Sequence, residues 1–394
     1  SLARKGEKVY VLTQGSAELP AEELINGVHV LRADSVAVSA NNFVDNILHL
    51  NFQLLDKAIQ LYSEIKEIDI IHGHDWLVFW ACKVLKHSLK LPLIYTIHAT
   101  EYGRNHGIYN DLQRYINDLE WYATFEAWKV IVCSQYMNNE VRHLFQLPED
   151  KVITIPNGVN PENFRLVHKE GFRENYASFA EDVVFYVGRL VREKGIQVLI
   201  QAIPEILKTN PSTKFIIAGK GPFLENLRSQ AEYLGIADRI YFTGFIDDED
   251  RNRLYQIADV AVFPSLYEPF GIVALEAMVT KTPLVVSNVG ELAEFVHNGE
   301  NGFTVNPNDP GQLAEKICYI LNNKKKAADI ADRAYQKVIR DFSWNKIAGK
   351  TMEIYEDVLY EYLKSDWTTE KEKNKREKSE ENNFVHRYAS SART

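Results

Sequence analysis

The sequence predicts an α/β protein of two Rossmann-like, doubly wound domains, in each of which helices cover both faces of a mostly parallel sheet. Short runs rich in β-branched residues recur along the chain and are apolar throughout, which is typical of strands buried on both faces. Amphipathic segments with a helical period separate these runs. The chain has 394 residues, 45% hydrophobic and 25% charged, so it has enough apolar material for more than one core.

The expected strands alternate with segments of helical period in both halves of the chain. They are residues 9–12, 68–72, 93–97 and 130–133 in the first domain, and 183–187, 215–218, 240–243, 260–263 and 284–287 in the second. Between two of the strands, Leu199, Ala202, Ile203 and Ile206 share one helical face. This alternation predicts parallel strands joined by helices.

A polar stretch at 160–181 interrupts the alternation and predicts a hinge between a domain at 1–165 and a domain at 175–342. Ser343 is expected to cap a long amphipathic helix at 343–365, which needs a partner surface. Residues 366–394 are rich in charged and polar residues, and we expect them to form a disordered tail.

The start of the chain resembles the last turn of a helix that ends at Gly6 and leads directly into the first strand. No strand and loop precede that turn. In a Rossmann sheet the first strand is central, so its loss splits the sheet instead of trimming an edge. Because an initiator methionine is also absent, we expect a fragment of a longer natural chain whose first domain lacks its first strand.

Composition argues against several classes of protein. The formal net charge of -9 disfavours a broad binding surface for nucleic acid or an anionic membrane. Cys82, Cys133 and Cys318 are far apart, which indicates neither a disulfide framework nor a thiolate metal site. No apolar run reaches the roughly 18 residues of a membrane span, and no signal-peptide pattern is present. We therefore expect a cytoplasmic protein without stable membrane insertion.

The strongest chemical signal is the segment Tyr267-Glu268-Pro269-Phe270-Gly271, which follows a buried strand. Pro269 and Gly271 predict a tight turn into a helix whose first amides lack internal partners, and such a helix start is an anion site. Glu276 lies among apolar residues, where a carboxylate needs a partner. Two carboxylates beside an anion site suit sugar hydroxyls, which donate hydrogen bonds. A helix-start charge and a half-exposed Glu276 remain an alternative.

A second signal follows the first strand of the second domain, where Gly188-Arg189-Leu190 precedes Glu193-Lys194-Gly195. Open α/β sheets bind ligands at the carboxyl ends of their strands. Arg189 offers a fork of donors and Lys194 a point charge, which together suit a diphosphate, although solvated side chains are the commoner case. The next strand ends in Gly219-Lys220-Gly221, which indicates close backbone approach to a ligand or simply tight packing.

The first domain places polar side chains at two strand ends. His74, Asp75 and Trp76 suit a sugar site, with the ring against the apolar face of the sugar and the polar groups at its hydroxyls. A metal site that includes His72 is disfavoured, because no further ligand has suitable spacing. The acidic run 247–250 is interpreted as a helix cap and not as a metal-binding motif. We expect neither metal nor cofactor.

Together these segments resemble glycosyltransferase family 4. The resemblance rests on the Glu-Pro-Phe-Gly turn with a second Glu eight residues later, on the Arg189 and Lys194 loop, on Gly219-Lys220-Gly221, and on Pro156-Asn157-Gly158-Val159; it extends over residues 72–341. Within the family, His74-Asp75-Trp76 is similar to a motif of glycogen and starch synthases. The resemblance implies the GT-B architecture, in which two Rossmann-like domains face across the donor cleft and the last helix crosses back to the first domain.

The resemblance also implies roles for individual residues. Arg189 and Lys194 would hold the donor diphosphate, Glu276 the ribose hydroxyls, and Glu268 the transferred hexose, with His98 next to the anomeric carbon. The expected catalytic set is His98, Glu268, Arg189 and Lys194; the donor-binding set is Gly219, Gly221, Phe270, Gly271, Ile272 and Glu276; the acceptor-binding set is His74, Asp75 and Trp76.

The implied activity is retaining, metal-independent transfer of a hexose, with glucose favoured, from UDP- or ADP-glucose to an α-glucan. Two departures from the family pattern stand out. Glu291 follows Gly290 where many relatives have a second glycine, and the glycine-rich loop that relatives carry after their first strand is absent. A sugar-phosphate or lipid-linked acceptor, a sugar-nucleotide epimerase and a non-catalytic nucleotide-sugar-binding subunit remain alternatives.

Overall fold

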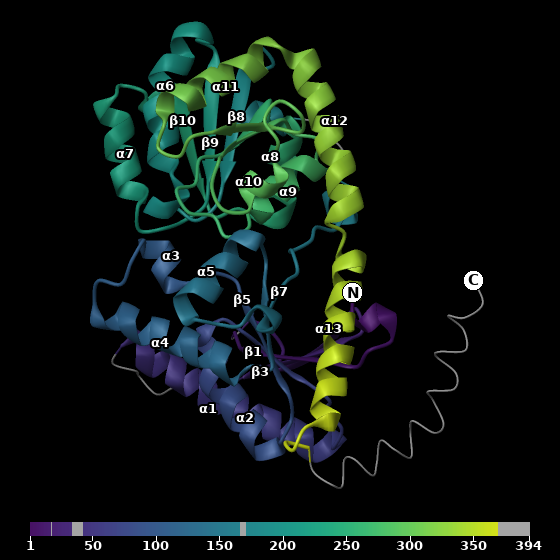
Figure 1. Cartoon of the computed structure of the whole chain (residues 1–394). Helices are drawn as coiled ribbons and strands as arrows, with labels where there is room; N and C mark the ends of the chain where they lie inside the picture. The colour runs from purple at the N-terminus through teal and green to yellow at the C-terminus, as the bar shows by residue number, and fades with distance from the viewer. Residues whose placement is uncertain (17, 34–41, 166–170, 369–394) are drawn as a thin grey trace, which may run out of the picture.

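The computed structural model describes residues 1–16, 18–33, 42–165 and 171–368, which form two α/β domains placed one above the other in Figure 1. The predicted tail from 369 onward and five residues of the predicted hinge, 166–170, lie outside the described residues. Both domains contain parallel strands with helices packed against them, so the predicted fold class is confirmed. Among the described helices, none combines the length and hydropathy needed to cross a bilayer.

The first domain contains two sheets. Its strands are β1 (Val9–Gln14), β2 (Glu22–Ile25), β3 (Val28–Ala33), β4 (Ile71–His74), β5 (Leu93–Ile97), β6 (Lys129–Val132) and β7 (Val152–Thr154). Its helices are α1 (Phe43–Ile65), α2 (Phe79–Leu89), α3 (Glu101–Asn105), α4 (Asp111–Glu126) and α5 (Gln135–Phe145). The strand order is β1-β3-β2 in one sheet and β4-β5-β6-β7 in the other. Within the described residues β1 and β4 do not pair, so the first domain has two separate sheets.

The second domain is a six-stranded parallel sheet with strand order β10-β9-β8-β11-β12-β13. Its strands are β8 (Asp182–Val187), β9 (Thr213–Ala218), β10 (Ile240–Gly244), β11 (Val260–Phe263), β12 (Leu284–Ser287) and β13 (Phe303–Val305). Its helices are α6 (Ile196–Thr209), α7 (Leu224–Tyr233), α8 (Asp248–Ile257), α9 (Ile272–Val279), α10 (Leu292–Phe295), α11 (Pro310–Asn322) and α12 (Lys324–Asp341). The chain order reverses between β8 and β11, and the crevice of an open parallel sheet lies at such a point.

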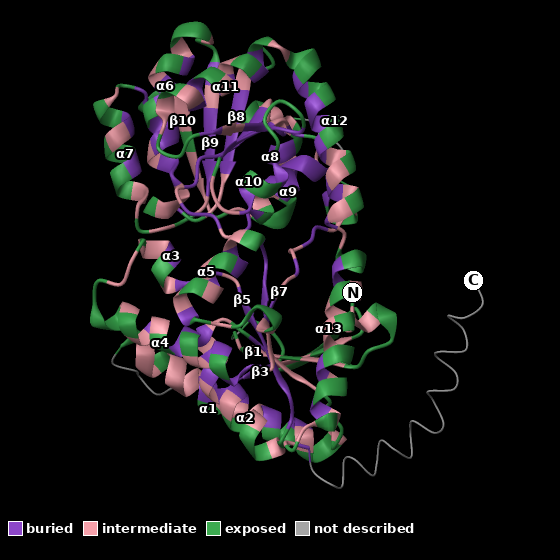
Figure 2. Cartoon of the chain, in the orientation of Figure 1, coloured by how far each residue is buried: buried purple, intermediate pink, exposed green. Residues whose placement is uncertain are grey.

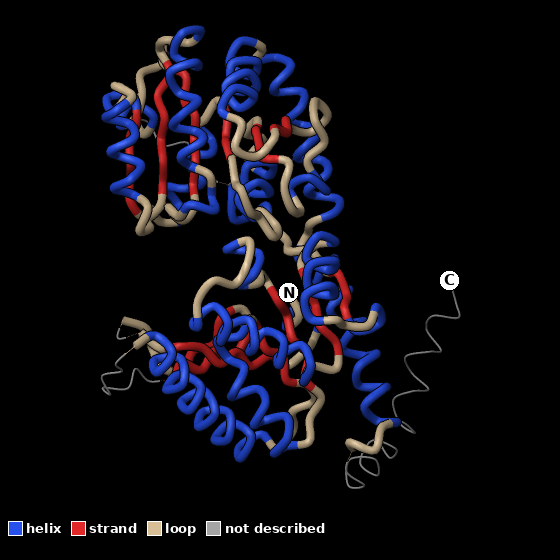
Figure 3. The backbone as a smooth tube through the Cα atoms, turned by 60° about the vertical axis from the view of Figure 1, so that its left-hand side comes forward, coloured by secondary structure: helices blue, strands red, loops and turns tan. Residues whose placement is uncertain are grey.

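The sheet of the second domain lies between layers of helices, as Figure 3 shows from the side. Every residue of β11 and β12 is buried, which explains why these strands have continuous apolar sequences. The helices present buried residues to the sheet and exposed residues to solvent (Figure 2). The core of this domain therefore fixes the ends of its strands, from which the functional loops emerge.

The last helix, α13 (Trp344–Lys364), runs from the second domain along the first (Figure 1). Ser343 caps it, because its side chain accepts a hydrogen bond from the Lys346 amide. Its Ile347 and Val358 pack against apolar residues of β5 and β6. The amide of Val159, which lies at the hinge, donates to the Phe342 carbonyl at 2.9 Å. Two chain segments thus cross between the domains side by side.

Candidate active site

A cleft of about 490 Å³ lies between the two domains. Its wall on the first domain includes His98, Ala99 and Arg104, which follow β5, and Asn157, which precedes the hinge. The loops that follow β8 and β11 form its wall on the second domain. The cleft thus opens at the carboxyl ends of the two strands between which the chain order reverses.

The turn after β11 places a buried carboxylate at the start of a helix. Glu268 is 6% exposed, and its Oε2 lies 2.7 Å from Lys194 Nζ and accepts a hydrogen bond from the Ser265 hydroxyl at 3.1 Å. Gly271 adopts φ +91°, a conformation that favours glycine, and α9 begins directly after it without a side-chain cap. The first amides of α9 are thus left without intrahelical partners beside the Lys194–Glu268 ion pair.

The loop after β8 carries Arg189 on the same wall of the cleft. The Arg189 side chain is 65% exposed and lies 3.5 Å from the Glu193 carboxylate. A Cβ at Gly219 would lie 1.9 Å from the Gly188 carbonyl oxygen, and one at Gly221 would lie 2.2 Å from that of Leu190. Both glycines therefore allow the next loop to pack behind the Arg189 loop. Tight packing accounts for the Gly219-Lys220-Gly221 motif, and the motif does not line the cleft.

Three imidazole rings form a stack that begins behind the cleft and ends at His98. The rings of His72 and His74 are 4.5 Å apart, and those of His74 and His98 are 5.3 Å apart, both nearly parallel. Nδ1 of His74 lies 3.1 Å from Nε2 of His98, so one of these two nitrogens must carry the shared proton. At the far end, His72 contacts the hydroxyls of Tyr355, on α13, and Thr96.

The stack holds its inner rings neutral. Burial lowers the pKa of His72 well below its ordinary range, and the neighbouring imidazoles lower it further. Partial burial and the adjacent His98 lower the pKa of His74 to about 4. Since both rings are uncharged near neutral pH, they orient His98 through hydrogen bonds and stacking and add no positive charge of their own.

Asp75 and Trp76 have structural contacts behind His98. Asp75 adopts φ +55°, and its Oδ1 accepts a hydrogen bond from the His98 amide at 2.8 Å. Trp76 is 5% exposed and packs edge-on against Phe43. Its ring is therefore a core residue and is not exposed for a sugar to stack on, in contrast to the expectation from the motif. Neither these two residues nor His74 lines the cleft.

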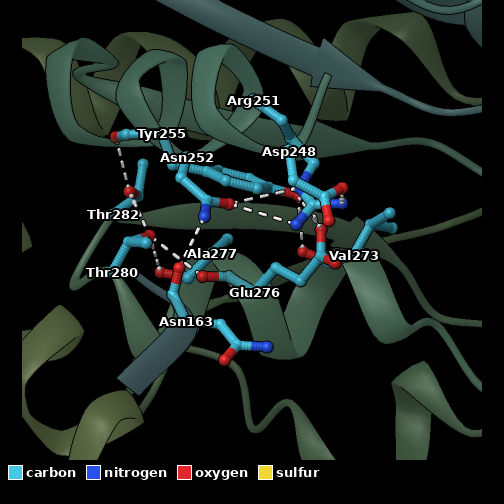
Figure 4. Close-up of polar contacts among 10 residues, drawn as sticks. All are labelled: Asn163, Asp248, Arg251, Asn252, Tyr255, Val273, Glu276, Ala277, Thr280 and Thr282. Carbon is cyan, nitrogen blue, oxygen red and sulfur yellow. Dashed lines mark hydrogen bonds and ion pairs between the residues drawn. The ribbon is translucent and has the colours of Figure 1, made fainter. Parts of the chain in front are cut away.

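Glu276 has the partners that its buried position requires (Figure 4). Tyr255 Oη donates to its Oε2 at 3.1 Å, and Arg251 Nε lies 3.5 Å from the same oxygen. Burial raises the pKa of Glu276, while Arg251 and Tyr255 lower it. The carboxylate thus lies against α8, one helical turn beyond the cleft-lining Val273, and does not itself line the cleft.

The acidic run after β10 is a helix cap, as the sequence predicts: the Asp247 side chain accepts a hydrogen bond from the Asp250 amide at 2.8 Å. Over the described ranges, no group of three His, Cys, Asp or Glu side chains is arranged to hold a metal ion.

The structure brings many of the expected site residues together. The residues that line one cleft are His98, Arg189, Lys194, Glu268, Phe270, Gly271 and Ile272, whereas Gly219, Gly221, Glu276, His74, Asp75 and Trp76 do not line it. Sequence reasoning assigned no role to Arg104 or Tyr267, which also line it. The signal for Arg104 was its place in the polar run that begins at His98, directly after a buried strand.

Two Rossmann-like domains that face each other across a cleft with Arg104, Arg189 and Lys194 in its lining are the arrangement of the GT-B fold of glycosyltransferases. A family model described as glycosyl transferases group 1 matches residues 169–337, and one described as Glycosyltransferase Family 4 matches residues 1–163. An uncharacterised glycosyltransferase of Methanocaldococcus jannaschii is 37% identical over 359 residues, which cover 90% of each chain. The chain therefore belongs to glycosyltransferase family 4.

Two further comparisons agree with this assignment. A glycogen synthase of Mycobacterium tuberculosis is 33% identical over 372 residues, which cover 90% of this chain and 88% of the relative. The solved structure of a sucrose-phosphate synthase from Thermosynechococcus elongatus is similar with a TM-score of 0.79 and 26% identity, and the match covers 91% of each chain.

Proposed function

We propose that the protein is a retaining, metal-independent glucosyltransferase that extends an α-glucan with glucose from UDP- or ADP-glucose. The observation that carries this proposal is the Lys194–Glu268 ion pair, with a bond of 2.7 Å, at the uncapped start of α9 in the interdomain cleft. A cation beside free helix amides suits a diphosphate, and the neighbouring carboxylate can accept hydrogen bonds from sugar hydroxyls.

The cleft residues supply positive charge for the leaving group. As the bond between the anomeric carbon and the diphosphate oxygen breaks, negative charge develops on the nucleoside diphosphate. Arg189, Lys194 and the first amides of α9 stabilise that charge without first having to reorganise. Because these groups can perform this role, we propose that transfer needs no divalent metal.

We propose a front-face displacement for the transfer step. The acceptor hydroxyl enters on the side of the leaving group, its oxygen bonds to the anomeric carbon, and its proton passes to the departing diphosphate oxygen. The products are a nucleoside diphosphate and a glucan longer by one glucose, with the α configuration retained. His98, oriented by Asp75 and the histidine stack, lies on the first-domain wall of the cleft, where it can contact the transferred sugar.

The choice of an α-glucan acceptor is supported by the 33% identity to a glycogen synthase over most of both chains. Because the Trp76 ring is buried, this choice does not depend on a sugar stacking on that ring. The His74-Asp75-Trp76 motif instead contributes the Asp75 carboxylate, which accepts a hydrogen bond from the His98 amide.

The experiment that tests this function is transfer of radiolabelled glucose from UDP-glucose and from ADP-glucose to glycogen, with and without a chelator. We expect incorporation from at least one donor, unchanged by the chelator, with α-linked product by NMR. Incorporation into glucose 6-phosphate but not into glycogen would show that the acceptor is a sugar phosphate and not an α-glucan. Release of free sugar nucleotide epimer without any acceptor would indicate an epimerase, and donor binding without any transfer would indicate a binding subunit.

A further inference from the structure

The second domain already pairs its cleft cations with carboxylates. Lys194 Nζ lies 2.7 Å from Glu268, and Arg189 lies 3.5 Å from Glu193. Each positive charge therefore has a carboxylate beside it before any ligand binds. A nucleoside diphosphate carries more than one negative charge, so its binding is favoured by positive charge beyond these two ion pairs.

Arg104 brings such a charge to the same cleft from the opposite domain. It belongs to α3, lines the cleft and is only partly exposed. None of the salt bridges between described residues includes its guanidinium group. A guanidinium that is partly withdrawn from water is costly unless an anion pairs with it, and its planar fork of donors matches phosphate oxygens.

The nearby carboxyl group of Glu120 does not neutralise Arg104. Both Glu120 oxygens accept hydrogen bonds from the Glu101 amide at 3.0 Å, so the group caps the start of α3. Burial raises the pKa of Glu120 to about 8, against the lowering effect of this amide and of Arg104. Glu120 is therefore mostly protonated at neutral pH, and the charge of Arg104 remains available to a ligand.

A contact between the domains fixes the position of Arg104. The preceding residue, Gly103, packs against the Tyr267 ring so closely that a Cβ would lie 2.4 Å from the Tyr267 oxygen. Tyr267 also donates a hydrogen bond to Glu140 of α5 at 3.1 Å. Since Tyr267 directly precedes Glu268, the contact joins the element that carries Arg104 to the turn that carries Glu268, and both residues line the same cleft.

We propose that Arg104 is a phosphate-binding residue that the first domain contributes to the site, and that it binds the diphosphate of the sugar donor when the domains are together. This inference rests on the proposed function. Arg104 would thereby supply the excess positive charge of the cleft and connect closure of the domains to capture of the donor.

The test compares wild type with Arg104→Ala and Arg104→Lys in calorimetric titrations with UDP, ADP, uridine, adenosine and inorganic pyrophosphate. Arg114→Ala, which removes an exposed arginine of α4, is the matched control. Loss of a charge-assisted contact is expected to weaken diphosphate binding by roughly 10- to 100-fold, to leave nucleoside binding unchanged, and to be partly rescued by lysine. Thermal melting monitored by circular dichroism verifies that each variant is folded.

The other outcomes overturn distinct claims. Unchanged diphosphate affinity in folded Arg104→Ala would remove Arg104 from the site and leave the proposed function standing. Equal losses for nucleosides and diphosphates would make the role of Arg104 structural. A loss for glucose 6-phosphate alone, in a parallel titration, would assign Arg104 to a phosphorylated acceptor instead. A wild-type protein that binds none of the phosphorylated probes would overturn both the inference and the proposed function.

Discussion

The side chains of Lys194 and Glu268 are 20% and 8% exposed. Withdrawing each charge from water costs free energy, and the ion pair between them offsets that cost. In the proposed function, a diphosphate that binds Lys194 would free Glu268 to accept hydrogen bonds from the sugar, so the pair would exchange an internal contact for contacts to the donor. This exchange is the residue-scale basis of the proposed function.

We predict that Lys194→Ala lowers kcat by roughly 100-fold or more, because it removes charge stabilisation of the departing diphosphate. The acceptor KM should change little, since Lys194 lies on the donor side. The measurement is steady-state kinetics with varied donor and acceptor. Lys208→Ala is the control, because Lys208 is 72% exposed and pairs with Glu205 on the same helix. Unchanged kcat in Lys194→Ala would remove this lysine from the mechanism.

Glu291 is buried and carries an unpartnered Oε2 within the described structure. Burial and the neighbouring Glu294 raise its pKa to about 9 from 4.5. Between these two values the folded protein retains a proton that the unfolded chain has released. Glu291 therefore stabilises the fold fully below pH 4.5, and this contribution falls as pH rises toward 9.

We predict that Glu291→Gln removes this pH dependence, because the amide stays neutral at every pH. The Tm difference, variant minus wild type, should grow more positive from pH 5 to pH 9 in differential scanning calorimetry. Glu300→Gln, which changes an exposed residue of the following loop, should show no such trend. A constant difference in Glu291→Gln would show that Glu291 titrates alike in the folded and unfolded chains.

At the scale of elements, the short helix α3 and the turn after β11 form one contact across the cleft. The Tyr267 ring faces Gly103 and lies edge-on to the rings of His106 and Tyr136. Because these elements belong to different domains, the contact determines how the two walls of the cleft meet.

We predict that Gly103→Ala, which adds a methyl group against the Tyr267 ring, displaces the turn that carries Glu268 and lowers kcat/KM for the donor by roughly 10- to 100-fold. Gly311→Ala is a matched control in another helix, where the nearest atom to the added carbon is 3.5 Å away. The measurement is kcat/KM for the donor, from steady-state kinetics of each variant. Equal activity of both variants would mean that the turn adapts to the methyl group without cost.

The strand and helix pattern shows what is predictable at this scale. Each expected strand overlaps an observed one, because strands buried on both faces need continuous apolar sequence. Three observed strands were not expected. β2 is exposed at every residue, His29 and Arg32 interrupt the apolar run of β3, and β13 has only three residues. β4 extends to His74, two residues beyond the expected end, because its histidines interrupt the apolar pattern by which strands were recognised.

At the scale of the whole molecule, contacts across the hinge determine how the domains face each other. Glu294 on α10 accepts hydrogen bonds from the amides of Gln135 and Tyr136, at 3.3 and 2.8 Å, at the start of α5. A carboxylate at a helix start is stabilised by the free amides there. The second domain thus caps a helix of the first.

We predict that Glu294→Ala weakens the closed arrangement by about 1 kcal/mol, the usual value of such a cap. The radius of gyration of the unliganded protein in small-angle X-ray scattering should increase, and saturating UDP should reverse the increase. Glu300→Ala, on the same domain but away from α5, should leave the scattering unchanged. An unchanged radius for Glu294→Ala would mean that other contacts between the domains, such as those of Tyr267 and α13, hold the domains together without this cap.

The sequence by itself determined the two-domain α/β fold and the loops that carry residues of the cleft, because apolar periodicity and glycine or proline turns are local properties of the chain. The tertiary structure alone decided that Trp76 belongs to the core, that Glu276 is held by Tyr255 and Arg251, and that Arg104 and Tyr267 face the cleft. These facts depend on the packing of segments far apart in sequence, whose side chains compete for the same space and the same partners.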